Sequence, residues 1–273
     1  MSIPQIGGGT IEHQSQLVEF LSNGSKPKSQ WKIGTEHEKF VYDKNSYLPL
    51  PYAGPCSIET ILTNLKKLYD WNPIFEDQYL IGLEKNGANV SLEPGGQLEL
   101  SGAPLDTIHE TCNEAYEHLN QVRQIAKKIG AGFIGLGAAP HWTEEMMPRM
   151  PKGRYALMTE YMKTIGKYGS QMMYRTCTIQ VNLDFSSEKD MIKKFRVSLA
   201  LQPVATALFA NSPLFDGMLS GYKSWRSRIW QVLDQNRTGM LPFVFEDGMG
   251  FDRYVDYALD VPMYFVYRNG KYI

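Results

Sequence analysis

One stretch of the chain carries most of the information about its fold: Ile33-Gly34-Thr35-Glu36-His37-Glu38-Lys39-Phe40. As a β-strand it places Glu36 and Glu38 on one face, because alternate residues of a strand point the same way. A strand in bulk water seldom needs a dense polar face, and a packed core would not tolerate unpaired acids. The stretch therefore predicts a strand whose acidic face belongs to a functional site.

Two further stretches repeat this pattern. Ser91–Ser101 is expected to form a second strand, with Gln97, Glu99 and Ser101 on one face and Leu98 and Leu100 on the other. Met173–Phe185 is expected to form a third. Its polar positions alternate with apolar ones, and they are Thr176, Thr178, Gln180, Asn182 and Asp184. Such strands side by side predict an α+β protein with a sheet whose concave face holds divalent cations and a polyanion.

Bulk properties exclude several classes of protein. The 273 residues carry 28 basic and 29 acidic side chains, which argues against a dedicated nucleic-acid or membrane-surface protein. Three widely spaced cysteines predict neither a disulfide framework nor a zinc site. No apolar run is long enough to span a bilayer, and the N-terminus resembles no secretory signal. We therefore expect a cytoplasmic protein.

Start and stop signals place the helices between these strands. Residues 12–24 are expected to form a short helix, followed by a connector at 25–30. Ser57 is expected to cap a helix, and Thr107 with Glu110 to open a long one that stops at Gly130. Further helices are expected at 155–165, 187–209, 222–233 and 251–259, and a buried strand at 133–137. The chain is expected to form a single domain over residues 1–273.

The last segment is unusual. Residues 262–268 are expected to form a strand, and Asn269-Gly270 is a strong signal for a two-residue hairpin turn. The returning strand has barely begun at Ile273, so we expect a polypeptide that is incomplete at its C-terminus.

Four glutamates form the first group that could carry chemistry: Glu36, Glu38, Glu93 and Glu99. Mg²⁺ takes oxygen ligands, commonly one or two carboxylates with phosphate oxygens and water. Gln180 and Asn182 on a neighbouring strand add neutral ligands or donors. The alternative is that these acids simply face solvent. Pro94-Gly95-Gly96 forms either a tight turn or a place where a ligand approaches the bare backbone.

Arginines form the second group. Arg154 lies in a loop entering a helix, and Arg226 lies between Trp225 and Trp230. A guanidinium suits bidentate recognition of a carboxylate or phosphate, although most arginines lie on the surface. His37 is predicted to be structural and Cys177 to be inert packing.

No phosphate-binding loop is present, since the chain contains no GxxxxGK[ST]. The run Gly135-Leu136-Gly137-Ala138-Ala139-Pro140 has proline where a dinucleotide fold needs its third glycine. If ATP binds, it does so through metal ions on a sheet.

Several long motifs resemble one family. IGTEHEKF, SLEPGGQLELSGAPL, MPKGRY, MMYRTCTIQVNLDFSSEKDMIKKFR, LALQPVATALFANSPLF and NRTGMLPFVFEDGMGFDRYVDYALDVPMYFVYRNGKYI are similar to glutamate–cysteine ligase (γ-glutamylcysteine synthetase) of the plant and proteobacterial type. The resemblance runs from about Gln16 to Ile273. It implies a glutamine-synthetase-like core, in which a curved antiparallel sheet forms half a funnel flanked by helices.

The resemblance also implies a reaction and its residues. ATP phosphorylates the glutamate γ-carboxylate, and the cysteine amine attacks the resulting acyl phosphate, which is the first step of glutathione synthesis. Glu36, Glu38 and Glu99 resemble the Mg²⁺ ligands, with Glu93 nearby. The residues that resemble the substrate-binding set are Arg154, Arg226, Tyr264, Trp225 and Gln180, and the two arginines are also the catalytic candidates.

Three interpretations stay open at this point. The chain is a ligase for L-glutamate, L-cysteine and ATP, a truncated remnant that binds amino acid or metal without turnover, or a ligase for another amine. Family members continue past Ile273 with a strand that helps complete the metal and nucleotide sites. The absence of a transit peptide favours a bacterial over a plastid protein. No nucleic-acid or membrane partner is expected, and monomer and homodimer are both open.

Overall fold

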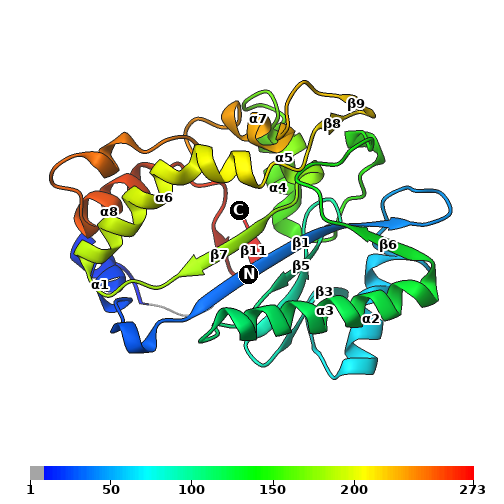
Figure 1. Cartoon of the computed structure of the whole chain (residues 1–273). Helices are drawn as coiled ribbons and strands as arrows, with labels where there is room; N and C mark the ends of the chain where they lie inside the picture. Colours follow the sequence, from blue (N-terminus) through cyan, green and yellow to red (C-terminus); the bar gives the residue numbers. More distant parts are fainter. Residues whose placement is uncertain (1–8) are drawn as a thin grey trace.

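The computed structural model describes residues 9–273. One antiparallel sheet forms its centre, with strand order β2-β3-β4-β5-β1-β6 and β7 added to β1 beside β6 (Figure 1). Its strands are β1 (Ile33–Asp43), β2 (Asn72–Glu76), β3 (Tyr79–Lys85), β4 (Ala88–Leu92), β5 (Leu98–Ser101), β6 (Ala131–Ile134) and β7 (Ile179–Leu183). The predicted α+β class with an antiparallel sheet is confirmed. The single domain over 1–273 stays a prediction, and its first eight residues lie outside the described part.

Side-chain caps start four of the helices in residues 9–273. The α-helices of this part of the chain are α1 (Gln14–Asn23), α2 (Ile58–Tyr69), α3 (Ile108–Ile129), α4 (Gly153–Met162), α5 (Gly169–Arg175), α6 (Glu188–Leu208), α7 (Trp225–Gln231) and α8 (Phe251–Asp260). The four capped helices are α2, α3, α6 and α7. The Ser57 side chain accepts a hydrogen bond from the Thr60 amide. Thr107 and Glu110 form a capping box at the start of α3, and Gly130 ends that helix in a left-handed conformation.

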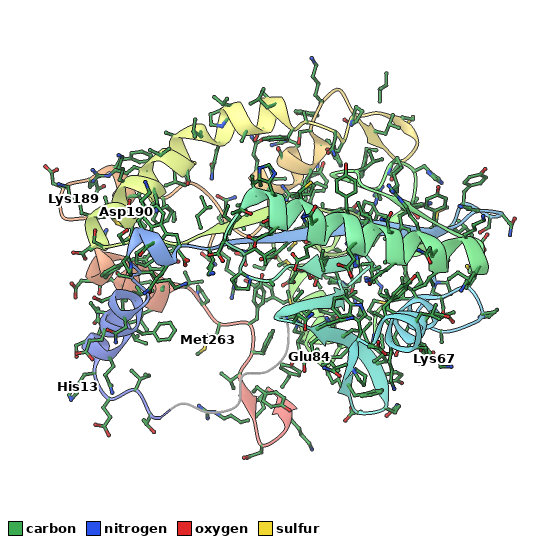
Figure 2. All side chains as sticks on the ribbon, turned by 60° about the horizontal axis from the view of Figure 1, so that its bottom comes forward. His13, Lys67, Glu84, Lys189, Asp190 and Met263 are labelled. Atoms are coloured by element: carbon green, nitrogen blue, oxygen red, sulfur yellow. The ribbon has the colours of Figure 1, made fainter. Side chains whose placement is uncertain are left out.

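The two faces of the sheet have different cover. On one face, Leu98 and Leu100 are fully buried in a core shared with the apolar sides of α2 and α3. Figure 2 shows α3 lying across β1 on this side. The opposite face carries the acidic residues of β1 and β5, and its apolar continuation, Phe40, packs in a second cluster with Met162 of α4. The sheet therefore has an apolar face that packs against α2 and α3, and a polar face that packs against α4 near Phe40.

Strand register decides which polar residues meet. Glu38 lies opposite Glu99 on β5, and Glu36 lies opposite both Ser101 on β5 and Gln180 on β7. Directly opposed residues of antiparallel strands share a face, so these side chains form two adjacent rows.

The second expected strand is instead a hairpin. Residues 91–101 contain the end of β4, a turn and β5, because Gly96 has a φ of 79° that reverses the chain after Glu93. The Glu93 amide donates to the Gln97 carbonyl at 2.9 Å and closes the turn. The expectation of one continuous strand was wrong, and the tight-turn interpretation of the two glycines is confirmed.

The third expected strand begins later than its sequence pattern suggested. Met173–Arg175 belongs to α5, and β7 starts only at Ile179. The amide group of Gln97 donates to the carbonyls of Met173 and Tyr174 at the C-terminal end of α5. This contact stabilises the last turn of the helix from a distant part of the chain, so local alternation could not reveal it.

Other boundaries differ as well. In the last segment β10 (Tyr267–Arg268) and β11 (Lys271–Tyr272) pair, joined by Asn269 and Gly270 with φ of 52° and 75°, and Val266 and Ile273 extend the pairing by two backbone hydrogen bonds. The hairpin turn is therefore confirmed, and most of the longer expected strand is not. The strand expected at 133–137 is β6, which ends at Ile134. The strands β2 and β3 were not expected, although Asn86-Gly87 is the same kind of hairpin signal.

The β7 strand leaves apolar side chains in solvent. Ile179, Val181 and Leu183 are 67 %, 58 % and 63 % exposed. On α6, the exposed apolar residues Val197, Leu201, Val204 and Leu208 follow a 4-3-4 spacing and so share one helix face.

Candidate active site

Two carboxylates face each other at the centre of the polar face. Glu38 on β1 and Glu99 on β5 are directly opposed, and Glu99 is buried. Its two oxygens accept hydrogen bonds from Ser91 Oγ at 3.0 Å and Ser101 Oγ at 2.9 Å. These hydroxyls fix the orientation of the Glu99 carboxylate.

Glu93 is the third member of this group. It follows β4 directly, and the turn after it directs its side chain toward Glu99. Burial together with the charges of Glu93 and Glu99 raises the pKa of Glu38 to about 8. Burial raises the pKa of Glu93 to about 7 against the opposing charge of Lys152. Acids that disfavour one another's ionisation form a site that a bound cation would stabilise.

Glu36 lies one row away and is already satisfied. Gln180 Nε2 donates to its Oε2 and Asn182 Nδ2 to its Oε1, both at 2.9 Å. The structure therefore brings the predicted Gln180 onto the same face as the acids, as the alternation of β7 requires. It separates Glu36 from the carboxylate group of Glu38, Glu93 and Glu99.

Both predicted arginines border the carboxylates. Arg226, in the first turn of α7, lies close enough to Glu38 to lower the pKa of that carboxyl, and Arg154, in the first turn of α4, acts likewise on Glu93. The Nε atoms of both arginines are buried, and among the described residues neither has a hydrogen-bond partner. Buried donors of this kind are rare in proteins and fit an anionic ligand.

Lys152 is a member of the site that sequence reasoning missed. It is 4 % exposed, and its Nζ donates to the Leu92 carbonyl at 2.7 Å, where Tyr155 Oη also donates. Burial lowers its pKa to about 8, although the charge of Glu93 raises it. The available signal was its place between a proline and a glycine in the loop that carries Arg154.

Two predicted substrate residues lie elsewhere. Trp225 is buried against Tyr168 and Phe215 in a small core cluster, so the structure gives it packing partners. Tyr264 contacts Tyr161 and Arg237. Within residues 9–273, Tyr264 makes no hydrogen bond, ion pair or ring contact with Arg154 or Arg226. The substrate roles of both residues stay predictions.

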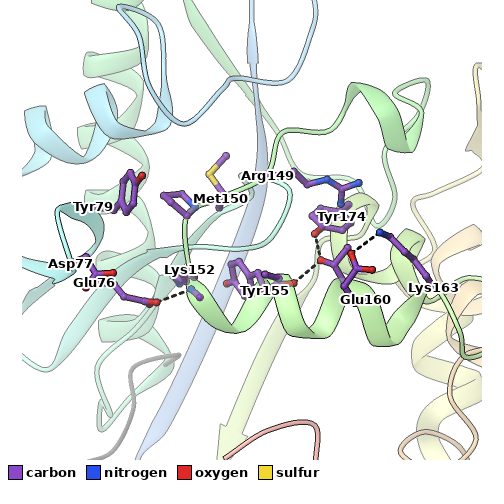
Figure 3. Close-up of a pocket in the computed structure, with 14 residues that line it drawn as sticks. Glu76, Asp77, Tyr79, Arg149, Met150, Lys152, Tyr155, Glu160, Lys163 and Tyr174 are labelled. Atoms are coloured by element: carbon purple, nitrogen blue, oxygen red, sulfur yellow. Dashed lines mark hydrogen bonds and ion pairs between the residues drawn. The ribbon is translucent and has the colours of Figure 1, made fainter. Parts of the chain in front are cut away.

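A pocket of about 570 Å³ adjoins this site (Figure 3). Figure 3 shows Glu76 and Tyr79, from β2 and β3, across from residues of α4 and the loop before it. None of the predicted site residues lines the pocket. Lys152 belongs to its wall and also contacts the strand end that carries Glu93, so the two features meet at this lysine.

The helix-covered face holds a second polar cluster. His37 lies there as predicted, with Nε2 3.1 Å from Thr35 Oγ1. Lys39 is buried with Nζ 3.3 Å from His118 Nε2 of α3. Burial lowers the pKa of His118 well below its usual range. Cys177 is fully packed and free, and burial raises the pKa of its thiol.

The carboxylates of the site meet some of the requirements for binding a metal ion. Within the described residues, no three His, Cys, Asp or Glu side chains are close enough to hold a metal ion by themselves. Mg²⁺ commonly takes only one or two carboxylates and completes its octahedron with phosphate and water. Glu38 and Glu99 fit that smaller requirement.

No helix of residues 9–273 is long and apolar enough to cross a bilayer.

Comparison with known proteins decides the family. The model of glutamate-cysteine ligase family 2 (GCS2) matches residues 32–273, which include all the carboxylates and arginines described above. The chain belongs to this family. It is 56 % identical over 260 residues to glutamate–cysteine ligase A, chloroplastic, of Oryza sativa subsp. japonica. It is 54 % identical over the same length to the chloroplastic glutamate–cysteine ligases of Brassica juncea and Arabidopsis thaliana.

These alignments cover most of this chain but only about half of each relative. They cover 95 % of this GCS2 chain but 52 %, 50 % and 49 % of the rice, Brassica and Arabidopsis enzymes. The chain thus spans about half the length of these relatives.

The predicted cytoplasmic location is wrong by the same comparison. Each of these relatives is named as a chloroplastic enzyme. The prediction of location rested on the composition of the N-terminal residues. The similarity to these enzymes instead comes from the 260 aligned residues.

Proposed function

We propose that this chain carries the acid and arginine part of an ATP-dependent glutamate–cysteine ligase site. The observation that carries the proposal is the convergence of Glu38, Glu93 and Glu99 near two arginines whose Nε atoms are buried. Membership of GCS2 and the names of the relatives supply the reaction.

The proposed reaction has two steps. The γ-carboxylate of L-glutamate attacks the γ-phosphorus of ATP, which releases ADP and forms an acyl phosphate. The amine of L-cysteine then attacks the acyl carbon, phosphate leaves with the bonding electrons, and the amine loses a proton. No side chain becomes covalently attached, so the protein contributes position and charge.

Glu38 and Glu99, with Glu93 beside them, are proposed to hold Mg²⁺, which neutralises phosphate charge when bound. The role of Glu36 as a ligand also stays a proposal. Its carboxylate would have to exchange the amides of Gln180 and Asn182 for the ion.

The arginines are proposed to bind anionic substrate groups. Arg154 and Arg226 each retain a buried Nε donor, and a carboxylate or phosphate oxygen would satisfy it. Tyr264 and Trp225 are proposed to line the amino-acid side of the site. The central sheet is proposed to be the half-funnel of a glutamine-synthetase-like core, and cysteine is favoured over other amines by the relatives' names.

The second candidate function is binding without turnover. It is favoured by the carboxylates, which do not form a complete metal site among the described residues, and by the exposed β7. In that case the chain binds glutamate or Mg²⁺ through the same residues and releases no ADP.

The deciding experiment measures ADP release by the purified chain with Mg²⁺, ATP and L-glutamate, with and without L-cysteine. A ligase shows cysteine-stimulated release that is lost in Glu99→Gln and Arg226→Gln. Calorimetry with glutamate and Mg²⁺ is run in parallel. Binding without ADP release identifies the second candidate.

Glu84→Gln is the matched control. Glu84 lies in the same row of the sheet as Glu36, but it is exposed near the end of β3. Activity or binding lost equally in Glu84→Gln and Glu99→Gln would contradict a specific role for the central carboxylates.

A further inference from the structure

Four side chains outside the acidic rows form a compact cluster. They are Tyr161 of α4, Asp234 and Arg237 in the loop after α7, and Tyr264 in the segment before β10. Arg237 Nη1 donates to Tyr161 Oη at 2.6 Å and to Asp234 Oδ2 at 2.5 Å. Tyr161 Oη donates to the same carboxylate oxygen at 3.0 Å.

The guanidinium of Arg237 also lies against both aromatic rings. Its Cζ is 4.0 Å from the ring centroid of Tyr264 and 4.7 Å from that of Tyr161. The two rings meet edge to face, with centroids 4.9 Å apart and planes at 89°. Cation–π contacts reach their larger values when the cation is withdrawn from water, and the Arg237 side chain is only 10 % exposed.

Local hydrogen bonds also hold Asp234 in place, in addition to its contact with Arg237. Asp234 is 1 % exposed, and its Oδ1 accepts the Asn236 amide at 3.0 Å. Its carbonyl accepts the amides of Arg237 and Thr238. The carboxylate therefore holds one position, and through it Arg237 and Tyr161 do as well.

Each of the three segments that supply the cluster also carries a residue of the proposed site. Tyr161 lies two turns beyond Arg154 on α4, and Asp234 follows the helix that begins with Trp225 and Arg226. In the third segment the residue is Tyr264 itself. Its segment, 261–266, has no helix or strand to hold it, and its neighbour Met263 is 78 % exposed (Figure 2).

We propose that Arg237 is a positioning residue, which holds the ring of Tyr264 in one orientation and ties that segment to α4 and α7. The consequence for substrate rests on the proposed function: Tyr264 lines the amino-acid side of the site only while Arg237 supports it. Arg237 itself touches no reacting atom.

The test places a single 3-fluorotyrosine at position 264 of the full chain and records its ¹⁹F spectrum. We expect one sharp resonance in the parent chain. Arg237→Gln shifts and broadens it, Arg237→Lys restores part of the parent signal, and Tyr161→Phe gives an intermediate change because it removes only the hydroxyl. Thermal unfolding is measured for each variant, and Tyr161→Phe serves if Arg237→Gln does not fold.

Arg253→Gln is the matched control. Arg253 is also an arginine over an aromatic ring, with Cζ 5.1 Å from the centroid of Phe243, but it is exposed and that ring is not part of the cluster. It should leave the resonance of residue 264 unchanged. A resonance that stays sharp and unshifted in folded Arg237→Gln overturns the proposal.

Kinetics form the second arm. Arg237→Gln should raise KM for the amino-acid substrates about tenfold, leave KM for ATP within about twofold, and be partly rescued by lysine. An equal loss for all substrates in a folded variant would overturn the link to the amino-acid side. If the parent chain neither binds glutamate nor releases ADP, the proposed function fails, and the ¹⁹F result still decides the positioning role.

Discussion

Glu38 and Glu99 lie directly opposite each other on the neighbouring strands β1 and β5. Like charges opposed across two strands destabilise a sheet, and here burial adds to the effect. The protein nevertheless keeps both carboxylates at its centre. We regard this unfavourable pair as the physical signature of a site that binds a cation.

Removing one of these charges should stabilise the metal-free chain. Glu38→Gln is expected to raise the free energy of unfolding by up to about 1 kcal/mol in chelator-treated buffer above pH 8, where the Glu38 carboxylate is ionised, because it removes the opposed charge. Added Mg²⁺ should stabilise the parent chain and not this variant. Urea unfolding with and without Mg²⁺ measures both effects. Glu84→Gln, on the exposed part of the same face, should retain the response to Mg²⁺, and an unchanged response in Glu38→Gln would contradict the assignment.

Asp234 should make stability depend on pH on the acid side. Burial opposes its ionisation, but hydrogen bonds from Arg237, Asn236 and Tyr161 outweigh burial and hold its pKa below the usual value. A depressed folded pKa means that the contribution is present above the unfolded value of about 3.9 and is lost as pH falls through the folded pKa. Asp234→Asn should cost about 3 kcal/mol at pH 7 and progressively less below pH 4.

Urea unfolding of Asp234→Asn and the parent chain between pH 3 and pH 7 provides the test. Asp256→Asn is the control, because this acid is exposed on α8 and its Oδ1 accepts a hydrogen bond from the exposed Gln14 Nε2. A stability difference that does not shrink on acidification would rule out the charge on Asp234 as its source.

Gly95 should tolerate no side chain. A Cβ at this position would overlap the carbonyl oxygen of Tyr174, and the Gly95 amide already donates to Gln97 Oε1 at 2.8 Å. Gly95→Ala is expected to destabilise the chain by about 1–3 kcal/mol and to displace the turn that holds Glu93. Gly135→Ala, which adds a methyl group in open space, should be near neutral. Equal stabilities of the two variants in urea would refute the packing argument.

Gln97 should support the end of α5 rather than a substrate. Its Nε2 lies 2.9 Å from the Thr176 carbonyl and within 3.4 Å of those of Met173 and Tyr174. Gln97→Leu leaves these buried acceptors without their donor and should cost about 1–3 kcal/mol. Gln235→Leu removes a longer and exposed amide contact and is the matched control. Hydrogen exchange at the α5 amides should increase only in Gln97→Leu; unchanged exchange would argue against this role.

The exposed row of β7 should promote self-association. Val181 is 58 % exposed between two equally exposed apolar neighbours on a strand that lies at the edge of the sheet. Val181→Lys is expected to shift the chain toward monomer in light scattering after gel filtration. Ile108→Lys changes an exposed residue at the start of α3 and should have no comparable effect. Association that persists unchanged in Val181→Lys would locate it elsewhere.

Several features were predictable because they depend on neighbours in the chain. The cap at Ser57 and the capping box of Thr107 and Glu110 join residues three positions apart, and the turn at Asn269-Gly270 needs only two residues of favourable backbone geometry. The strand β1 and its acidic face were predictable for the same reason, since alternation is a local property.

The predictions that were wrong concern segments whose structure depends on contacts with residues distant in sequence. The hairpin within 91–101 and the helical start of 173–185 are coupled through Gln97, which lies 76 residues from Met173. The strands β2 and β3 were not predicted because their residues lack the alternation of acidic and apolar side chains.

The sequence alone determined the family, the acidic and amide faces of the central strands, and the helix boundaries set by caps. Only the tertiary structure decided that Glu38 opposes Glu99, that Lys152 reaches the strand carrying Glu93, and that Arg237 supports Tyr264. Each of these pairs joins segments that are remote in sequence, as Tyr161 and Asp234 are across 73 residues. Their approach is set by strand register and by packing against the sheet, which no short stretch of sequence encodes.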